Sequence, residues 1–263
     1  MEILVCVKRV PDLSENEIEL NALGNDIERD DLVYSVNEPD NYAVEEALQI
    51  VERSGGNVTV VTVGNEDDEE VLRRELAMGA QSAALLSDES FAASDGRGTA
   101  ITLKSFVTKG HYDLILTGVQ AEDAGAQVGG MLAAMLDYPF ASLVNSIEVQ
   151  PGRKLQVTRE IEGGNREVNE IDLPCVLSIQ TGINEPRYVG MRGIRQVASV
   201  AIPSFGAAEL GIDRNEVGEE AAKVRRIDYF TPVSNKHAEM LQGSPEEMAD
   251  QLIELLKAKG GLQ

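Results

Sequence analysis

The sequence contains no tryptophan, and aromatic residues make up only 4% of its 263 positions. Proteins that bind single-stranded nucleic acid stack bases on aromatic side chains, and few are available here. Positive charge is also scarce, because 23 Lys and Arg stand against 45 Asp and Glu, for a formal net charge of −22. Nucleic acid and anionic membranes attract basic residues, so we expect neither as a partner. The charge suits a basic partner, or simply a very soluble or salt-adapted surface.

The chain has two cysteines, Cys6 and Cys175, which are far apart and form no CxxC pair. They indicate neither a disulfide framework nor a zinc site, and a reducing intracellular setting is the default. The opening residues 1–7 lead directly into a strand pattern and lack the zones of a signal peptide. No apolar run approaches the length that spans a membrane. We therefore expect a cytoplasmic protein with no metal site and no direct membrane insertion.

Strand and helix patterns alternate through the first 135 residues. The predicted strands are 3–7, 58–63, 83–86 and 114–116, and the predicted helices lie at 39–55, 67–79 and 99–109. Alternation of this kind is typical of an α/β fold with a doubly wound parallel sheet and right-handed crossovers. Ligands of such sheets bind beyond the carboxyl ends of the strands, where the strand order reverses. The candidate ligand-binding edges are therefore residues 7–10, 64–66 and 117–123.

After Met135 the hydrophobic period changes to two, which predicts an antiparallel β extension of the core. The predicted strands of this extension are 140–149, 155–161, 167–171 and 176–179. From Asn184 to Gln242 no periodicity is sustained, and a stretch that long without clear elements suggests an arm that a partner orders. We therefore predict a nucleotide-binding core with its β extension at residues 1–183. Residues 184–263 are predicted to form the arm and a C-terminal helix.

The C-terminal helix has a clear start signal. Ser244 is the predicted N-cap, Pro245 takes the first helical position, and Glu247 completes a capping box. An apolar stripe follows along the helix, formed by Met248, Leu252, Leu255 and Leu256. This stripe packs either on the protein's own core or in the groove of a partner.

The segment from residue 116 to residue 130 carries the most chemical information. It follows a buried strand and leads into a helix rich in Ala, Leu and Met. Small residues at such a point let backbone N–H groups approach a phosphate at the helix N-terminus, and the side chain of Gln127 is within reach of a phosphate or ribose. A tight turn whose glycines serve packing alone explains the segment about as well, because it is neither a Walker motif nor a GxGxxG.

Other polar positions are weaker candidates. Residues 37–41 begin the first helix, so each polar side chain there is either a ligand contact or an N-cap. Arg97 either pairs with a phosphate or is solvated. His111 and His237 are isolated, and the sequence shows no catalytic dyad, nucleophile elbow or metal cluster. The residues therefore predict nucleotide binding without bond-making chemistry, and no catalytic residue.

Six short stretches resemble segments of the electron-transfer flavoprotein beta subunit, in that family's order. They are residues 5–12, residue 37 with residues 43–47, and residues 76–80, 120–129, 159–164 and 184–188. They include R-E-I-E-G-G at 159–164 and N-E-P-R-Y at 184–188. Each stretch is short, but together they extend from the first residue to about residue 195, and the ordered set is specific.

The resemblance implies a sheet of the adenine-nucleotide-binding type in one half of a heterodimer. The alpha subunit would carry the redox-active FAD, and this chain would hold AMP or a second FAD. Such dimers carry electrons from flavin dehydrogenases, such as acyl-CoA dehydrogenases, to a downstream oxidoreductase, without bond-making catalysis in this subunit. The nucleotide contacts that the resemblance implies are Val7, Arg9, Asn37, Gly64, Asn65, Ala121, Asp123, Gln127 and Val128.

The stretch after residue 188 resembles the family's recognition loop, which docks on the dehydrogenase. Met191 occupies the place of its apolar anchor, and an adaptable thioether suits a promiscuous docking surface; a core methionine is the alternative. The resemblance also implies that Glu160 contacts an Arg of a partner. The Lys-rich run that often follows this loop is replaced by Arg195-Gln-Val-Ala-Ser199, which suggests a different docking partner.

Two departures bear on the nucleotide. The main loop, 122–126, is one residue shorter than usual and lacks the second acid and the Thr of electron-bifurcating members, which favours AMP. The insertion at 95–99 is similar to those same members, so an alternative is a bifurcating oxidoreductase that oxidises NADH at a second FAD. A further alternative is a stand-alone adenine-nucleotide-binding protein of the stress type. Such a protein shares the α/β core but needs neither the β-rich segment 140–180 nor the arm.

Overall fold

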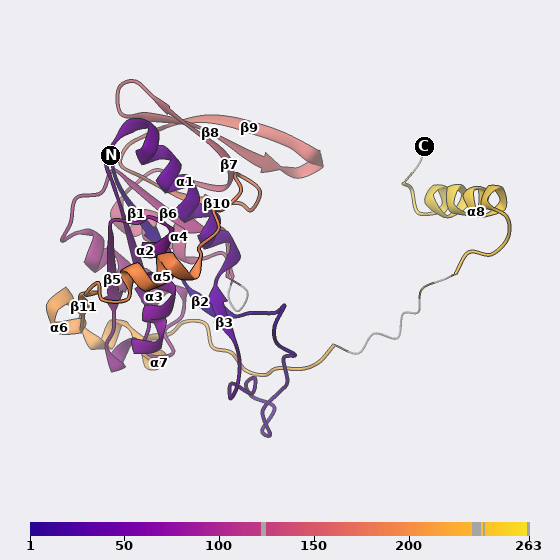
Figure 1. The fold of residues 1–263 in the computed structure, drawn as a ribbon. Coiled ribbons are helices and arrows are strands. Elements are labelled where there is room, and N and C mark those ends of the chain that lie inside the picture. Colours follow the sequence, from indigo (N-terminus) through magenta and orange to yellow (C-terminus); the bar gives the residue numbers. More distant parts are fainter. Residues whose placement is uncertain (122–124, 233–237, 239, 262–263) are drawn as a thin grey trace. The chain divides into compact units, whose positions relative to one another are not determined.

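In the computed structural model, which describes every residue except 122–124, 233–237, 239 and 262–263, the chain forms two compact units (Figure 1). The first unit comprises residues 1–19 and 28–227, and the second comprises residues 20–27 and 228–263. The first unit contains the whole sheet described below. No helix in the described part of the chain combines the length and apolar character needed to cross a bilayer.

The first unit is built on a nine-stranded sheet with the order β11-β5-β4-β1-β6-β10-β7-β8-β9. Every neighbouring pair from β11 to β7 is parallel, whereas β8 and β9 are added antiparallel. The strands are β1 (Glu2–Cys6), β4 (Asn57–Val63), β5 (Ser82–Leu86), β6 (Leu114–Gly118), β7 (Phe140–Gln150), β8 (Lys154–Ile161), β9 (Asn165–Asp172), β10 (Cys175–Ile179) and β11 (Ser204–Phe205). This mostly parallel sheet confirms the predicted α/β class.

Helices cover both faces of the sheet. The main helices are α1 (Glu38–Ser54), α2 (Glu69–Met78), α3 (Gly96–Val107) and α4 (Val128–Leu136), and the shorter ones are α5 (Met191–Val197), α6 (Ala207–Leu210) and α7 (Gly218–Ala221). Ile3 and Val5 of β1 pack in one apolar cluster with α1 and α2, whereas Leu4 between them packs in a second cluster with α3 and α4. Successive side chains of a strand point to opposite faces, so the continuous apolar run of β1 serves both layers.

The strand β10 differs from the sequence prediction, which placed residues 176–179 in the antiparallel extension. In the structure β10 is parallel to both of its neighbours, β6 and β7. Every residue from Cys175 to Ile179 is buried. A strand buried on both faces shows a continuous apolar run rather than alternation, and the run Cys175-Val-Leu has that form. Within the described nine-stranded sheet, the antiparallel pairs are β7–β8 and β8–β9.

Part of the segment after residue 183 packs on the sheet. The strand β11 pairs with β5, and Asp88 accepts a hydrogen bond from the Ala207 N–H at 3.0 Å. Asp95 accepts one from the Lys223 N–H at 2.6 Å. Residues 184–227 therefore belong to the first compact unit. The predicted organisation, with a partner-wrapping arm beginning at residue 184, stays a prediction.

The second unit contains α8 (Pro245–Ala258). The Ser244 side chain accepts a hydrogen bond from the Glu247 N–H at 3.3 Å, and the Glu247 carboxylate accepts one from the Ser244 N–H at 2.8 Å. The predicted capping box is therefore confirmed. No residue of α8 is buried, and its side chains Leu252, Ile253 and Leu256 are exposed. Whether its apolar stripe meets this protein's own core or a partner stays open.

Candidate functional site

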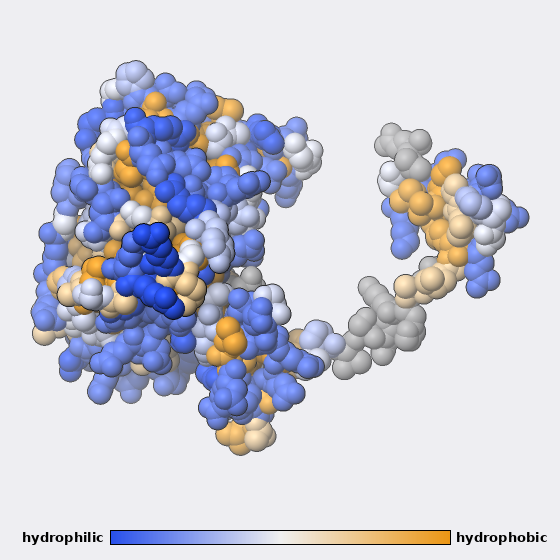
Figure 2. Space-filling model, viewed as in Figure 1, coloured by the Kyte–Doolittle hydropathy of each residue, from blue (hydrophilic) through white to orange (hydrophobic). Residues whose placement is uncertain are grey.

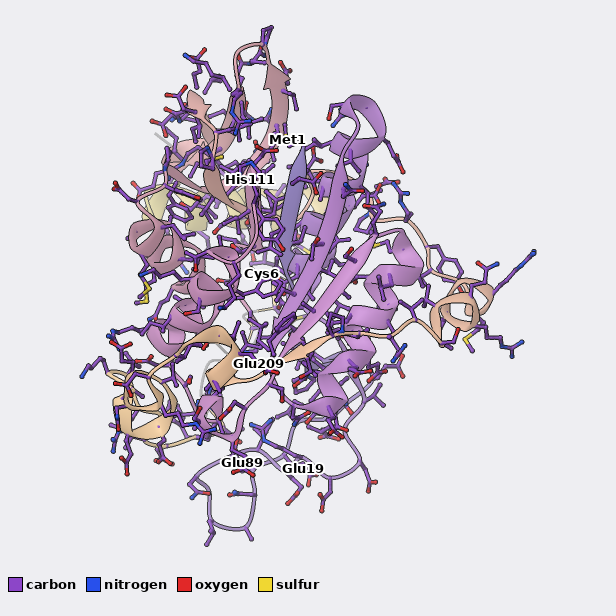
Figure 3. All side chains as sticks on the ribbon, turned by 90° about the vertical axis from the view of Figure 1, so that its left-hand side faces the viewer. Met1, Cys6, Glu19, Glu89, His111 and Glu209 are labelled. Atoms are coloured by element: carbon purple, nitrogen blue, oxygen red, sulfur yellow. The ribbon has the colours of Figure 1, made fainter. Side chains whose placement is uncertain are left out.

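The carboxyl ends of β1, β4 and β6 meet at one edge of the sheet, as the sequence predicts. The Val7 N–H donates to the Val61 carbonyl at 2.9 Å, and the Val119 N–H donates to the Ile179 carbonyl at 3.0 Å. Figure 3 shows Met1 and His111 towards the opposite, amino end of these strands. His111 is exposed there and lies 3.9 Å from Asp113, at the end of the sheet away from the candidate site.

Asp40, in the first turn of α1, joins two of the strand ends. Its carboxylate accepts hydrogen bonds from the N–H groups of Lys8 and Gly118, both at 2.9 Å. A side chain at Gly118 would collide with Asp40 and Pro39. Burial raises the pKa of Asp40 to about 7. The sequence grouped Asp40 with its polar neighbours at the helix start, but did not identify it as the residue that ties this edge together.

Asn37 lies beside Asp40 with an oxygen atom that has no partner. It takes the N-cap position of α1, but its side chain does not cap the helix. Instead its Nδ2 donates to the Gln120 carbonyl at 2.8 Å. Its Oδ1 is buried and accepts no hydrogen bond from the described residues, although Asn37 is only 1% exposed. Buried acceptors are normally satisfied, so this oxygen is an acceptor that the donor of a ligand can use.

Asn37 lines a cavity of about 190 Å³ between the start of α1 and the end of β6. The other lining residues are Glu38, Pro39, Val119, Gln120, Ala121, Gln180 and Thr181. The predicted contact Ala121 is therefore close to Asn37. Asp123, a further predicted contact, lies outside the described residues.

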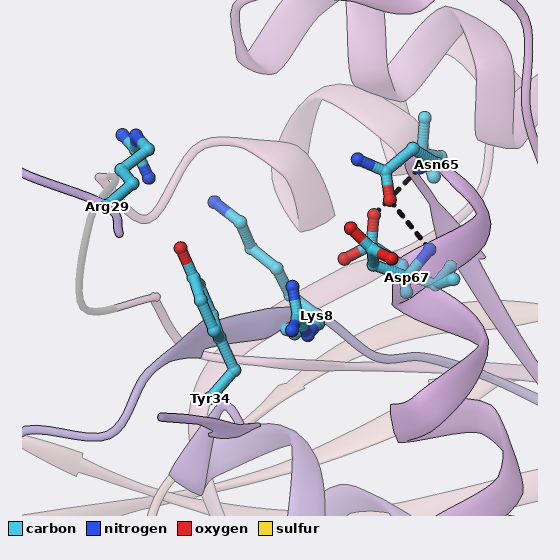
Figure 4. A pocket seen from close by; sticks show the side chains of 9 residues that line it. Lys8, Arg29, Tyr34, Asn65 and Asp67 are labelled. Atoms are coloured by element: carbon cyan, nitrogen blue, oxygen red, sulfur yellow. Dashed lines mark hydrogen bonds between the residues drawn. The ribbon is translucent and has the colours of Figure 1, made fainter. Parts of the chain in front are cut away.

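A second cavity, of about 340 Å³, lies at the ends of β1 and β4 (Figure 4). One backbone hydrogen bond joins the linings of the two cavities: the Asn37 N–H donates to the Lys8 carbonyl at 2.9 Å. Its lining residues are Lys8, Arg9, Arg29, Tyr34, Thr62, Val63, Asn65, Asp67 and Asp68. Three of these side chains are basic, in a protein of large negative charge. The cavity therefore suits an anionic group on its basic side.

Two short elements shape this larger cavity. The strands β2 (Arg9–Pro11) and β3 (Tyr34–Val36) form an antiparallel pair that stacks the Arg9 guanidinium on the Tyr34 ring, 3.8 Å from its centroid. Across the cavity, Asn65 accepts a hydrogen bond from the Asp67 N–H at 2.8 Å and its own N–H donates to Asp68 at 2.8 Å. A side chain at Gly64 would collide with Asp68, so this predicted site residue is needed for the close turn.

The helix α4 begins directly against the sheet. A Cβ atom at Gly129 would lie 2.5 Å from Ser178 Oγ and 2.8 Å from Thr117 Oγ1, so only glycine allows this approach. The N-cap residue Gln127 makes no side-chain cap, and Val128 opens the helix. The first N–H groups of a helix have no intrahelical acceptor and favour an anion. The start of α4 can therefore receive a phosphate.

Comparisons with known proteins identify relatives of this chain. The family model described as the electron transfer flavoprotein domain matches residues 25–210. The electron transfer flavoprotein subunit beta of Methylophilus methylotrophus is 36% identical, over 97% of this chain and 98% of that protein. The corresponding subunit of Thermoanaerobacterium thermosaccharolyticum is 35% identical over 98% and 99%. The chain belongs to the electron transfer flavoprotein beta-subunit family. A further relative, 35% identical over 98% of this chain and 99% of its own length, is the caffeyl-CoA reductase-Etf complex subunit CarD of Acetobacterium woodii.

In this electron transfer flavoprotein chain, the residues predicted to dock on a dehydrogenase lie on the surface of the first unit. Met191 begins α5 and is 64% exposed, and Tyr188 is 92% exposed, so Met191 is not a core residue of the described structure. Arg192 and Arg195 are exposed on the same helix. Figure 2 shows strongly hydrophilic atoms over α5 beside apolar ones. Glu160 is exposed on a different element, β8, opposite Arg166 of β9.

Proposed function

We propose that this chain is the beta subunit of a heterodimeric electron-transfer flavoprotein. It carries electrons, with its alpha subunit, from a flavin dehydrogenase to a downstream oxidoreductase. An adenine nucleotide sits at the carboxyl edge of β1, β4 and β6. The observation that carries this proposal is the buried, unpartnered Oδ1 of Asn37 at that edge.

The residues at this edge fit an adenine nucleotide. The Asn37 oxygen accepts a hydrogen bond, and an adenine amine or a ribose hydroxyl supplies the donor. The start of α4 accepts the phosphate through its free N–H groups. The basic side chains of Lys8, Arg9 and Arg29 add positive potential at the neighbouring cavity. The role of these residues is to bind and orient the nucleotide and to keep water from it.

AMP is the proposed nucleotide of this chain, and FAD is held mainly by the alpha subunit. The bound FAD supplies the electron-transfer chemistry of the heterodimer. The short loop 122–126 lacks the second acid and the Thr of the D-G-D-T-A-Q-V-G pattern of bifurcating members. This supports AMP because the loop offers fewer contacts to a diphosphate and a ribityl chain. The second candidate is a second FAD in an NADH-oxidising, electron-bifurcating enzyme. The 340 Å³ cavity at the ends of β1 and β4 supports that alternative, since it offers space for a ligand in addition to the Asn37 cavity.

The decisive experiment is to co-express this chain with its alpha subunit, denature the purified complex and quantify the released nucleotides by chromatography. One FAD with one AMP is the expected result. Two FAD without AMP would replace the carrier by the bifurcating candidate. If neither a complex nor flavin is found, the heterodimer is contradicted and the stand-alone nucleotide-binding protein remains. That alternative gives no function to the antiparallel strands β7–β9.

A matched variant separates this chain's nucleotide from the alpha subunit's flavin. Asn37→Leu removes the buried acceptor and the hydrogen bond to Gln120 without adding charge. We expect the variant complex to lose AMP and to keep its FAD. Equal AMP content in the variant and in the wild type would show that the nucleotide does not use Asn37.

The exposed Met191 is proposed as the apolar anchor for an acyl-CoA dehydrogenase, and Glu160 as a contact to an Arg of a partner. Truncating an exposed anchor weakens docking but leaves the flavin in place. In the Met191→Ala heterodimer we therefore expect the dehydrogenase to reduce the flavin with a raised KM. An unchanged KM for the dehydrogenase would contradict the role of Met191.

A further inference from the structure

Residues 184–200, here called the docking segment, are fastened to the first unit at both ends. At the start, Arg187 Nε and Nη2 donate to the two oxygens of Glu45 at 2.8 and 3.0 Å. The side-chain amide of Asn184 donates to the Tyr42 carbonyl at 3.1 Å. These contacts tie the start of the segment to α1.

At the other end, one guanidinium from α2 holds the end of α5. Arg73 Nη1 donates to the carbonyls of Val197, Ala198 and Val200 at 3.3, 3.1 and 3.1 Å. Its Nη2 donates to Glu69 at 2.8 Å, which orients the guanidinium from one turn earlier on the same helix. The last carbonyls of a helix have no intrahelical partner, and a cation there also meets the negative end of the helix dipole.

The helix α5 depends on such support because it has only seven residues. Isolated helices of that length are not stable in water. Between the two fastened ends, Gly193 lies against α2, where an added Cβ atom would be 3.4 Å from the Ala77 carbonyl oxygen. Packing on α2 and the cap by Arg73 therefore replace the stability that length would give.

We infer that Arg73 is a positioning residue for electron-donor docking. It holds α5 folded so that Met191, Arg192 and Arg195 face outward in one fixed arrangement. Among the described residues, neither Arg192 nor Arg195 has a hydrogen-bond or ion-pair partner, so both charges are available at that surface. The inference rests on the proposed docking role of Met191. It adds Arg73 to the residues that determine docking. Arg73 belongs to α2 and acts by holding α5, without contacting the electron donor itself.

Arg73→Met in the heterodimer tests the clamp itself, with trypsin as the probe. In this variant three carbonyls lose the guanidinium as hydrogen-bond donor, but they lie near the surface. Glu69 is partly exposed, so no buried charge is left unpaired and the variant is expected to fold. Trypsin cuts after Arg192 and Arg195 only when α5 opens. We expect those cleavages, followed by mass spectrometry, to be about tenfold faster in the variant. Arg73→Lys keeps the charge but has fewer hydrogen-bond donors. Its cleavage rates should lie between those of the wild type and of Arg73→Met.

Two controls accompany the proteolysis. Arg74→Met removes the same charge from the next, exposed position of α2 and should cleave at the wild-type rate. Cleavage after Arg226 should be equal in all variants, and an unchanged melting temperature would show that the fold is intact. Wild-type cleavage rates after Arg192 and Arg195 in Arg73→Met would overturn the inference.

Kinetics then separate this inference from the proposed function. An acyl-CoA dehydrogenase of the same organism, reduced with its acyl-CoA, serves as electron donor, and dithionite reduces the flavin without docking. We expect Arg73→Met to raise the donor KM about tenfold with unchanged kcat and unchanged dithionite reduction. If Met191→Ala raises KM but Arg73→Met does not, the positioning role is wrong and the docking surface stands. If neither variant changes KM, the docking proposal fails together with this role.

Discussion

Asp40 and Glu75 are both buried carboxyl groups of the first unit, but their surroundings differ. Asp40 accepts hydrogen bonds from the Asn37 side chain and from two backbone N–H groups, and these partly offset the effect of burial on its pKa. Glu75 is 0% exposed, and neither of its oxygens accepts a hydrogen bond from the described residues. Burial raises the pKa of Glu75 to about 8; the charge of Arg74 opposes this effect, and the charges of Asp40 and Glu45 add to it. Glu75 is therefore mostly protonated at neutral pH.

Glu75 makes the stability of the protein depend on pH. Its pKa is about 8 in the folded state and near 4.5 in the unfolded state, so between these values the unfolded state binds fewer protons. The free energy of unfolding therefore falls as the pH rises through this window. Glu75→Gln removes the titration, so its stability relative to the wild type should improve by a few kcal/mol as the pH rises from about 5 to about 8.

Urea denaturation of the heterodimer at several pH values measures this difference. Glu66→Gln, an exposed carboxyl just before the same helix, is the matched control and should keep a constant offset from the wild type. The same constant offset for Glu75→Gln would mean that Glu75 is ionised in the folded protein.

At this scale the sequence singled out some residues of the proposed site and missed others. It offered Asn37 and Gln127 as candidates because polar side chains at helix starts can contact a ligand, but it did not separate that role from an N-cap or a packing turn. Asp40 could not be separated from its polar neighbours, since nothing local shows which side chain reaches the distant N–H of Gly118. The burial of Glu75 is predictable from the sequence, because Glu75 lies four residues after Val71 on the apolar face of its helix.

Helix α4 shows how an element and its site depend on a single missing side chain. Gly129→Ala adds a Cβ that meets the hydroxyls of Ser178 and Thr117 below 3 Å. These buried hydroxyls hydrogen-bond to each other, so we expect the start of the helix to move away from the sheet rather than break that bond. We expect this variant to lose AMP from the purified complex, because the N–H groups at the helix start are displaced. Released AMP per FAD, measured by chromatography, is the readout.

Gly130→Ala provides the matched control for this helix. Its Cβ would meet the Phe140 ring at 3.5 Å, an ordinary contact, and both substitutions gain the same helix propensity. The control should keep its AMP. Equal AMP in both variants would place the phosphate away from the start of α4.

The second prediction at the scale of elements concerns the contact between α1 and the docking segment. Burial alone would raise the pKa of Glu45, but the hydrogen bonds from Arg187 and Gln49 outweigh it and hold that pKa below its ordinary value. Arg187→Met leaves the Glu45 carboxylate buried without its main partner. We expect this variant to lose about 3–5 kcal/mol of stability at neutral pH.

Adding Glu45→Gln to Arg187→Met removes the unpaired charge and should restore part of the lost stability. Denaturation of the heterodimer measures both variants. The lowered pKa also sets a pH dependence: the stabilisation by Glu45 is present above its unfolded pKa and is lost as the pH falls through the folded value. An additive double variant would show that the two side chains are not coupled.

Elements were more predictable than their pairing. The alternation of apolar runs and amphipathic stretches gave the four core strands β1, β4, β5 and β6 and their helices. The predicted antiparallel direction of β10 was wrong, because strand pairing depends on residues far away in the chain, whereas hydrophobic periodicity is local. The short strands β2, β3 and β11 have two or three residues each, which is too few to show a hydrophobic periodicity in the sequence.

At the scale of the molecule, the two compact units lead to a prediction about where the chain can be cut. All residues that line the two cavities lie in the first unit, which ends at residue 227. Deleting residues 228–263 should leave the first unit folded, because it breaks none of the contacts of Asp88, Asp95 and Glu45. The deletion is expected to weaken the heterodimer, since the proposed partner-wrapping arm is shortened.

Deleting residues 184–263 removes much more. It strips β11 from the edge of β5 and takes away Arg187, which leaves Glu45 without its main partner. It also removes the N–H groups that donate hydrogen bonds to Asp88 and Asp95. We expect the longer deletion to melt well below the 228–263 deletion and to be largely insoluble. Differential scanning calorimetry and size-exclusion chromatography of the two proteins with the alpha subunit distinguish the cases. Equal melting temperatures would mean that the nucleotide-binding unit ends near residue 183, and that residues 184–227 add nothing to its stability.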